Sequence, residues 1–229
     1  MTTSIFAGLC DGNAGLHEAA LNHPVVRGIG SGTLDESTFR YYLEQDFVFL
    51  THYVRVLARA VDAAPDLDTA EPIADLLHAT LTVEIDALRH LYRQLGGEEG
   101  DLNDVVASPT CRAYIDHLLA VSSERDLPLI LAAILPCQWG YGDIGRRLHE
   151  RGLPGDPRYR QWIEEYASET YHSVVGSTVR LFDRLASTES SVRLKRIDDV
   201  FHLSSSYELR FWEMAWQQEH WCVASTLHL

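Results

Sequence analysis

Hydrophobic residues recur along most of the chain at intervals of three and four positions, which is the spacing of an amphipathic helix. The clearest series follows a capping-box pattern at Thr33–Glu36, whose end side chains can satisfy free backbone N–H groups, and continues to about Ala63. The series consists of Phe39, Leu43, Phe47, Leu50, Val54, Leu57 and Val61. No segment alternates between apolar and polar residues for long enough to indicate a strand. The pattern predicts an all-helical protein.

Cap residues, prolines and glycines divide the rest of the chain into further helices. The predicted ranges are 13–23, about 70–96, 109–122, 126–151, 157–187 with a break near Ala167, and 190 to the end. The linkers are short, and no repeat or low-complexity segment interrupts the chain. We expect one all-α domain of about eight helices, spanning residues 1–229.

Two carboxylates fall on helix faces that the spacing turns toward the core. Asp46 lies on the stripe of the helix that ends near Ala63, and Glu208 lies on the inward stripe of the last helix. Burying an unpaired carboxylate is costly, so each is either a structural acid with a bonded partner or part of a polar cavity. Two such acids on separate core helices favour the cavity.

The segment Leu127–Leu135 is apolar on every side and predicts a helix through the centre of the domain. Cys137 and Tyr141 follow one turn apart on the same face, and Pro136 removes a backbone hydrogen bond just before the cysteine. A lone buried cysteine is either an inert small hydrophobe or a nucleophile. Its position makes Cys137 a candidate nucleophile.

The composition excludes several classes of partner. Asp and Glu number 33 against 19 Lys and Arg, for a net charge of −14, which repels nucleic acids and anionic membranes. The N-terminus has no basic residue before Arg27, and the longest apolar run, Leu127–Cys137, is too short to span a bilayer. The dispersed cysteines indicate reduced thiols in a cytoplasmic protein. They are Cys10, Cys111, Cys137 and Cys222.

Tryptophans in the last predicted helix indicate a subunit interface. Trp212, Trp216 and Trp221 are more than one helix face can bury in a monomer of this size. We therefore expect a homo-oligomer.

A metal site finds little support in the sequence. Di-iron bundles use two Glu-x-x-His pairs and two further glutamates, whereas Glu169–His172 is one such pair and a second is missing. We expect no bound metal or cofactor.

The segments around Asp46, Cys137, Tyr166 and Glu208 resemble the TenA family of thiaminase II enzymes, in the branch that contains the cysteine. They read FRYYLEQDFVFL, LPCQWGYGDIG, WIEEYASETYH and FHLSSSYELRFWEMA. Together with the spacing between them, they span nearly the whole chain. The resemblance implies a haem-oxygenase-like helical fold, usually a homotetramer, without haem or metal.

The resemblance also implies an activity and a set of site residues. The family hydrolyses the C–N bond at the 5-methylene of 4-amino-5-aminomethyl-2-methylpyrimidine, releasing ammonia, and can cleave thiamin. By motif, Cys137 corresponds to the nucleophile, Glu208 to the proton-transfer residue, and Asp46 to the acid that holds the ring nitrogen and the amino group. The pocket-lining residues would be Phe49, Tyr114, Tyr141, Tyr166 and Phe211.

Phe49 stands where members of the family often carry tyrosine, so a hydroxyl contact is lost there and a stacking surface remains. Two alternatives stay open from the sequence. One is a PqqC-like oxidase or a di-iron oxygenase on the same fold, and the other is a non-catalytic pyrimidine-binding regulatory protein. The preferred substrate, thiamin or a related aminopyrimidine, is also open.

Overall fold

The computed structural model describes residues 4–222, and within this range the chain forms helices and loops with no strand. The predicted all-α class is therefore confirmed. The helices are α1 (Ile5–Gly12), α2 (Ala14–Leu21), α3 (Pro24–Ser31), α4 (Glu36–Ala63), α5 (Leu67–Ala79), the π-helix η1 (Thr80–Glu84), α6 (Ile85–Gln94), the 3₁₀ helix η2 (Glu99–Asp104), α7 (Pro109–Ser123), α8 (Leu127–Arg151), α9 (Pro157–Ala167), α10 (Glu169–Ala186) and α11 (Ser191–Gln217).

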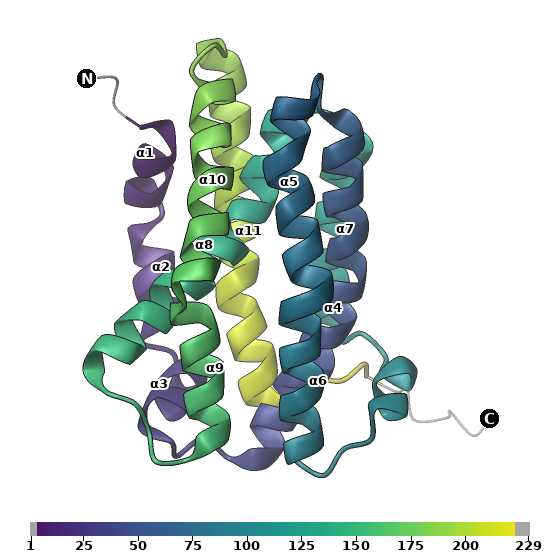
Figure 1. Ribbon diagram of the computed structural model, residues 1–229, viewed down its shortest axis with the longest axis vertical. Helices are drawn as coiled ribbons and strands as arrows, with labels where there is room; N and C mark the ends of the chain where they lie inside the picture. The colour runs from purple at the N-terminus through teal and green to yellow at the C-terminus, as the bar shows by residue number, and fades with distance from the viewer. Residues whose placement is uncertain (1–3, 223–229) are drawn as a thin grey trace, which may run out of the picture.

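The long helices form a bundle around α8 (Figure 1). This helix packs against α7, α9, α10 and α11, while α1, α2 and α3 lie along one side of the bundle. Every residue from Leu129 to Leu135 is fully buried, as the apolar run predicted. By length and composition α8 would suit a membrane span, but 83% of its most apolar window is buried inside the protein. It is the core helix of the fold.

Most predicted helix starts are confirmed by their caps. Each of these side chains accepts a hydrogen bond from a backbone N–H in the first turn, which satisfies one of the free donors there. They are Ser108, Asp126, Asp156 and Ser190. The break near Ala167 is also confirmed, because Ser168 separates α9 from α10 and caps the second of them.

The predicted capping box at Thr33–Glu36 is wrong. The cap of α4 is Asp35, whose carboxylate accepts from the Ser37 N–H at 2.8 Å. The Thr33 hydroxyl is bonded to Ser31 instead, at 2.7 Å. An acid directly before the helix reaches its free N–H groups, whereas Thr33 lies too far upstream.

The ends of the chain also differ from the prediction. Helices α1 and α3 were not predicted, and the helix predicted over 70–96 is divided into α5 and α6, so residues 4–222 hold eleven α-helices rather than about eight. The last helix does not run to the end of the chain: it stops at Gln217, because Gln218 takes a left-handed conformation with φ 48°. The rest of that predicted helix, residues 223–229, lies outside the described residues.

The long helix predicted over 70–96 contains a π turn at η1. The buried positions before the turn are spaced by three and four residues, but the interval from Thr80 to Ile85 is five. A π turn holds one extra residue, which shifts the inward face of the helix. Leu81 and Val83 are about half-exposed in this turn although both are apolar.

The predicted interface role is wrong for Trp212, which is fully buried. Its ring stacks on Tyr42 and on Tyr141, each at a centroid distance of 5.2 Å, in an aromatic core between α4, α8 and α11. Trp216 and Trp221 are 45% and 55% exposed. These two tryptophans remain available to a partner, and the oligomeric state stays a prediction.

Asp143 fastens α2 to the central helix. Its carboxylate lies 2.7 Å from His17 Nε2 on α2, and it also pairs with Arg146 and Arg147 on α8. Burial works against the charge of this carboxylate, but the hydrogen bonds and cations hold the pKa of Asp143 below its usual value.

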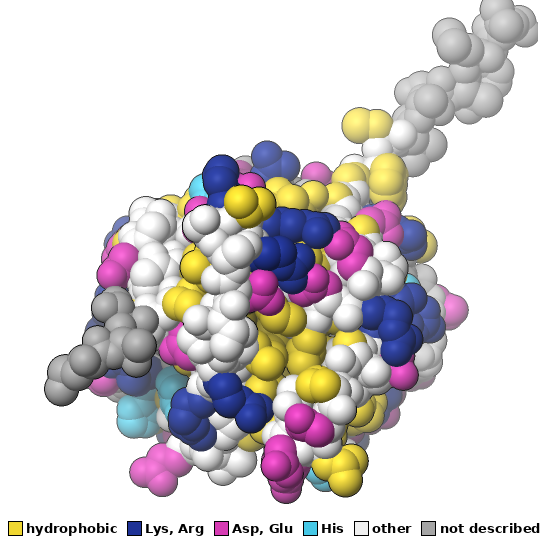
Figure 2. Space-filling model, turned by 90° about the horizontal axis from the view of Figure 1, so that it is seen from above, with side chains coloured by type: hydrophobic (Ala, Val, Ile, Leu, Met, Phe, Trp, Pro, Cys, Tyr) yellow, Lys and Arg dark blue, Asp and Glu magenta, His cyan; other side chains and the backbone are white. Residues whose placement is uncertain are grey.

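Elsewhere on the surface, charged side chains of both signs are dispersed around an apolar hollow at one end of the bundle (Figure 2).

Gly145 allows α8 and α9 to approach closely. A Cβ placed there would lie 2.6 Å from Cβ of Tyr166 and 2.8 Å from its carbonyl carbon. The same helix carries Gly140, where an added Cβ meets nothing within 4 Å.

We predict that Gly145→Ala destabilises the fold by about 1–3 kcal/mol, because the added methyl forces the two helix backbones apart. Gly140→Ala is the matched control and should be neutral or stabilising by up to about 1 kcal/mol, because alanine favours the helix more than glycine does. Urea unfolding followed by circular dichroism measures both. Equal stability of the two variants would contradict the proposed close contact.

Candidate active site

Asp46, Cys137 and Glu208 come from α4, α8 and α11, which pack against one another in the middle of the bundle. Both acids are buried, as the inward stripes predicted. Burial is the main cause that raises the pKa of the Cys137 thiol, and the charges of Glu208 and Asp46 are among the further causes. The three groups therefore lie within electrostatic reach of one another, although they are far apart in the sequence.

Glu208 is held by two neighbours. The Tyr114 hydroxyl donates to its Oε1 at 2.6 Å, and the Cys137 thiol lies close enough to act on the same carboxylate. Burial raises the pKa of Glu208 to about 7, and Tyr114 and Cys137 limit that rise. A group with a pKa near neutrality can both accept and return a proton, which suits a general base that later acts as an acid.

The surroundings of Cys137 favour the thiol over the thiolate. Burial raises its pKa well above the usual value, and the charges of Glu208, Glu84 and Asp46 raise it further. The residue as a whole is nevertheless partly accessible, in contrast to the fully buried Cys111.

The pKa of Asp46 is also raised well above its usual value. Burial is the main cause, followed by the negative charge of Glu84, and the neighbouring Tyr42 hydroxyl opposes the rise only in part. A neutral carboxyl group can donate a proton to a basic ring nitrogen and then pair with the resulting cation.

Aromatic rings line the region between these groups. Phe49 lies 4.9 Å from Tyr114 and 5.7 Å from Phe211, measured between ring centroids. On the other side, Tyr141 and Tyr166 are 5.0 Å apart. The predicted site residues therefore form two linked groups: Phe49, Phe211 and Tyr114 with Glu208, and Tyr141 with Tyr166. Asp46 and Tyr166 line one narrow pocket, and Tyr141 and Glu208 line another. Their roles in binding and catalysis are proposals that follow below.

Glu84 is a site residue that the sequence analysis missed. It lies in the π turn η1, and the Tyr166 hydroxyl donates to its Oε1 at 3.2 Å. Burial and then the neighbouring Glu165 raise the pKa of Glu84, to about 7, against the hydrogen bond from Tyr166. π turns occur often at functional sites, but the hydrophobic pattern did not reveal this one, because the polar Thr80 is buried while the apolar Leu81 and Val83 are about half-exposed.

Tyr53 was also missed. Its hydroxyl is buried without a hydrogen-bond partner, and its ring stacks on Phe49 at 5.6 Å. Its pKa is raised mainly by burial and then by the charges of Cys137, Glu84 and Glu208, so the hydroxyl lies near the site. A tyrosine on an apolar stripe gives no sequence signal that separates it from an ordinary core residue.

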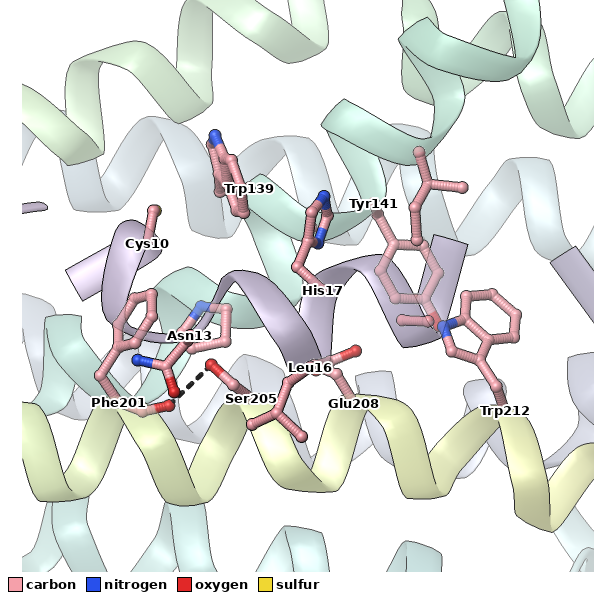
Figure 3. Close-up of a pocket in the computed structure, with 14 residues that line it drawn as sticks. Cys10, Asn13, Leu16, His17, Trp139, Tyr141, Phe201, Ser205, Glu208 and Trp212 are labelled. Atoms are coloured by element: carbon pink, nitrogen blue, oxygen red, sulfur yellow. Dashed lines mark hydrogen bonds between the residues drawn. The ribbon is translucent and has the colours of Figure 1, made fainter. Parts of the chain in front are cut away.

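Two cavities adjoin the site. The larger, about 290 Å³, lies between α5, η1, α8, α9 and α10 and is lined by Glu84, Gln138 and Tyr171 among others. The smaller, about 30 Å³, lies between α2, α8 and α11, and it is large enough for a water molecule. Figure 3 shows Glu208 on the α11 side of the smaller cavity, with Trp139 opposite.

Within residues 4–222, no three His, Cys, Asp or Glu side chains are grouped as ligands for a metal ion. The pair Glu169–His172 lies on α10, beyond the cluster of acids around Cys137.

Comparison with known proteins identifies relatives along nearly the whole chain. The aminopyrimidine aminohydrolase of Halalkalibacterium halodurans is 34% identical over 221 residues, which covers 95% of this chain and 98% of that protein. The aminopyrimidine aminohydrolase of Bacillus subtilis is 33% identical over 204 residues, covering 89% of this chain and 86% of that protein.

Solved structures agree with the expected haem-oxygenase-like fold. A TenA family transcription regulator from Silicibacter sp. TM1040 superposes with a TM-score of 0.85 at 28% identity, covering 92% of this chain and 96% of that one. Haem oxygenase-1 of Synechocystis sp. PCC6803, at 14% identity and a TM-score of 0.67, covers 94% of each chain and shares the fold. The sequence profile of the TENA/THI-4/PQQC family matches residues 14–218, and the chain belongs to this family.

Proposed function

We propose that this protein is an aminopyrimidine aminohydrolase that acts in thiamin salvage through Cys137. The observation that carries the proposal is that one thiol and two buried acids lie within electrostatic reach of one another, in a part of the bundle rich in aromatic side chains. The names of two relatives at 33% and 34% identity support the substrate class. An aminopyrimidine is flat, basic at a ring nitrogen and rich in N–H donors, and the site offers stacking surfaces and acids to match.

Asp46 binds and activates the pyrimidine in this mechanism. Its neutral carboxyl group donates a proton to the ring nitrogen, and the carboxylate then holds the ring N–H and the amino group as a charge-assisted pair. The protonated ring is a better electrophile because it can accept an electron pair.

The first half of the reaction expels the amine. Glu208 takes the proton from Cys137, and the sulfur forms a bond to a carbon of the pyrimidine ring. The electron pair that enters the ring moves outward and breaks the bond between the methylene carbon and nitrogen. Glu208 returns its proton to the leaving nitrogen, so ammonia departs neutral and Glu208 is a carboxylate again.

The second half restores the enzyme. Water adds to the methylene carbon while Glu208 accepts its proton, and the bond between ring and sulfur breaks to give the hydroxymethyl pyrimidine and a thiolate. The proton on Glu208 then returns to the sulfur. The smaller cavity beside Glu208 has room for the water that this step consumes.

We also propose the homotetramer and the cytoplasmic setting that the family resemblance implies. The exposed Trp216 and Trp221 are apolar surfaces suited to a subunit contact. The cysteines within the described residues are all free, which suits a reducing compartment.

The decisive test is ammonia release from 4-amino-5-aminomethyl-2-methylpyrimidine. We expect the wild-type protein to form ammonia and the hydroxymethyl pyrimidine in equal amounts. Cys137→Ser should lose about 10³-fold or more in kcat while it still binds the pyrimidine, since the weaker nucleophile leaves the pocket intact. Cys222→Ser, an exposed thiol, is the control and should match the wild type.

Near-wild-type turnover in Cys137→Ser would falsify the covalent mechanism while leaving the activity in place. Absence of turnover in the wild-type protein, with pyrimidine binding retained, would instead favour a regulatory protein, which is what the Silicibacter relative is called.

Asp46→Asn should weaken pyrimidine binding and lower kcat together, each by about tenfold or more, because the amide can neither protonate the ring nor pair with its charge. Asp62→Asn makes the same chemical change at the exposed end of α4, where Asp62 pairs with Arg125, and should have little effect. Isothermal titration measures the affinity for the pyrimidine, and steady-state kinetics measure kcat. A loss of kcat at unchanged affinity would exclude the binding role of Asp46.

The pH profile of kcat/KM tests Glu208. The wild-type rate should rise as pH increases through about 7, because the cycle starts with Glu208 as a carboxylate. Tyr114→Phe removes a hydrogen bond that lowers the pKa of Glu208, so its rising limb should move upward by about one pH unit, the equivalent of about 1.4 kcal/mol. Tyr207→Phe is the control: it removes a hydroxyl from a ring that stacks on Tyr114 at 5.1 Å, without removing the hydrogen bond to Glu208, and should leave the limb in place. An unshifted limb in Tyr114→Phe would exclude Glu208 as the titrating base.

A further inference from the structure

The cavity of about 290 Å³ is not used by the reaction as described above. Its walls come from α5, η1, α8, α9 and α10, and in Figure 1 α5 and α10 stand side by side with α8 passing behind them. Its volume is near the lower end of the range for small-molecule pockets.

The cavity borders the reacting region. Glu84 lines it and also lines the narrow pocket that contains Asp46 and Tyr166. Gln138, which directly follows Cys137 on α8, lies in its wall. The cavity and the pocket of Asp46 are therefore neighbours that share the side chain of Glu84.

The polar groups in the cavity wall call for a hydrogen-bond donor. Gln138 is 4% exposed, and its Oε1 is buried without any partner, which is costly unless a ligand supplies an N–H. The Tyr171 hydroxyl is not available to this side-chain oxygen, because it donates to the backbone carbonyl of Gln138 at 3.0 Å. Glu84 and Glu165 add two acids, and no Lys, Arg or His lines this cavity.

The rest of the lining is apolar and can accommodate carbon substituents. Leu76 and Ala79 come from α5, and Val174 and Val175 come from α10. A ligand that suits both parts carries a positive charge with N–H donors next to a hydrocarbon group. Ammonia alone would fill little of this space.

We propose that this cavity is a leaving-group subsite. In it, Glu84 and Gln138 recognise a positively charged, substituted amino group that is attached to the pyrimidine methylene and departs as an amine. The inference rests on the proposed hydrolase function and extends it to N-alkylated aminomethyl pyrimidines. Water replaces the amine as before, so the products are the hydroxymethyl pyrimidine and a primary amine.

The test uses three ligands that share the pyrimidine: the unsubstituted aminomethyl compound, its N-benzyl derivative, which is a cation at neutral pH, and the neutral benzyl ether of the same shape. Dissociation constants are measured by isothermal titration with Cys137→Ser protein, so that turnover does not interfere. We expect the N-benzyl compound to bind at least about tenfold more tightly than the ether, because only the cation pairs with Glu84.

Two further substitutions, Glu84→Gln and Ala79→Phe, separate the effect of the charge of Glu84 from the effect of the free volume of the cavity. Glu84→Gln should reduce the preference for the cation over the ether by about tenfold, and Glu164→Gln, an exposed acid on the neighbouring α9, should leave it unchanged. Ala79→Phe fills the cavity and should weaken both benzyl ligands by about tenfold relative to the unsubstituted compound. Because Ala79 borders open space, this variant also keeps the test informative where Glu84→Gln impairs folding.

Kinetics of the wild-type protein separate this inference from the function on which it rests. Ammonia release from the unsubstituted compound together with benzylamine release from the derivative supports both. Hydrolysis of the unsubstituted compound alone overturns the subsite and keeps the hydrolase. No hydrolysis of either compound overturns both. A crystal structure of the Cys137→Ser complex with the benzyl group anywhere but between α5 and α10 also overturns the subsite.

Discussion

The desolvation of three carboxyl groups around one sulfur is the constraint on which the site depends. Asp46, Glu84 and Glu208 are removed from bulk water in a part of the bundle with little compensating positive charge, so their pKa values all rise. The pKa values of Glu84 and Glu208 lie at about 7, where a carboxyl group can both accept and return a proton at neutral pH. An open cleft would leave these acids charged and the same residues without a means of proton transfer. The enclosure is therefore part of the chemistry.

That enclosure is built from close contacts between helices. Gly145 lets α9 approach α8 closely enough for Tyr166 to reach both Tyr141 and Glu84. Trp212 fills the space between α4, α8 and α11, so the helices that carry the two predicted acids and the thiol are fixed relative to one another. Close packing of this kind fixes the positions of side chains on neighbouring helices relative to one another. The hydrogen bond of 2.6 Å between Tyr114 and Glu208 requires such precise placement.

The sequence predicted the helical class, most helix starts and the central helix because period and caps are local signals. It singled out Asp46 and Glu208 because a polar residue on an apolar stripe contradicts the pattern around it. The same reasoning failed in η1, where the hydrophobic pattern does not follow burial. There the polar Thr80 is buried, while the apolar Leu81 and Val83 are exposed. Glu84 was lost there, and Trp212 was assigned to the surface because counting tryptophans cannot show how many the core accepts.

The π turn has a consequence for the evolution of the chain. It inserts one residue into a helix that otherwise advances about 100° per residue. Loss of a single codon between 80 and 84 would restore regular winding, because the interval of five from Thr80 to Ile85 would become four, a spacing that returns to the same face of an α-helix. The buried residues of α5 and α6 could then still all face the core, and the change would be confined to the widened turn that carries Glu84. A homologue with a one-residue gap in this segment should therefore keep the packing of both helices but wind this turn differently, even where it keeps an acid at the position of Glu84.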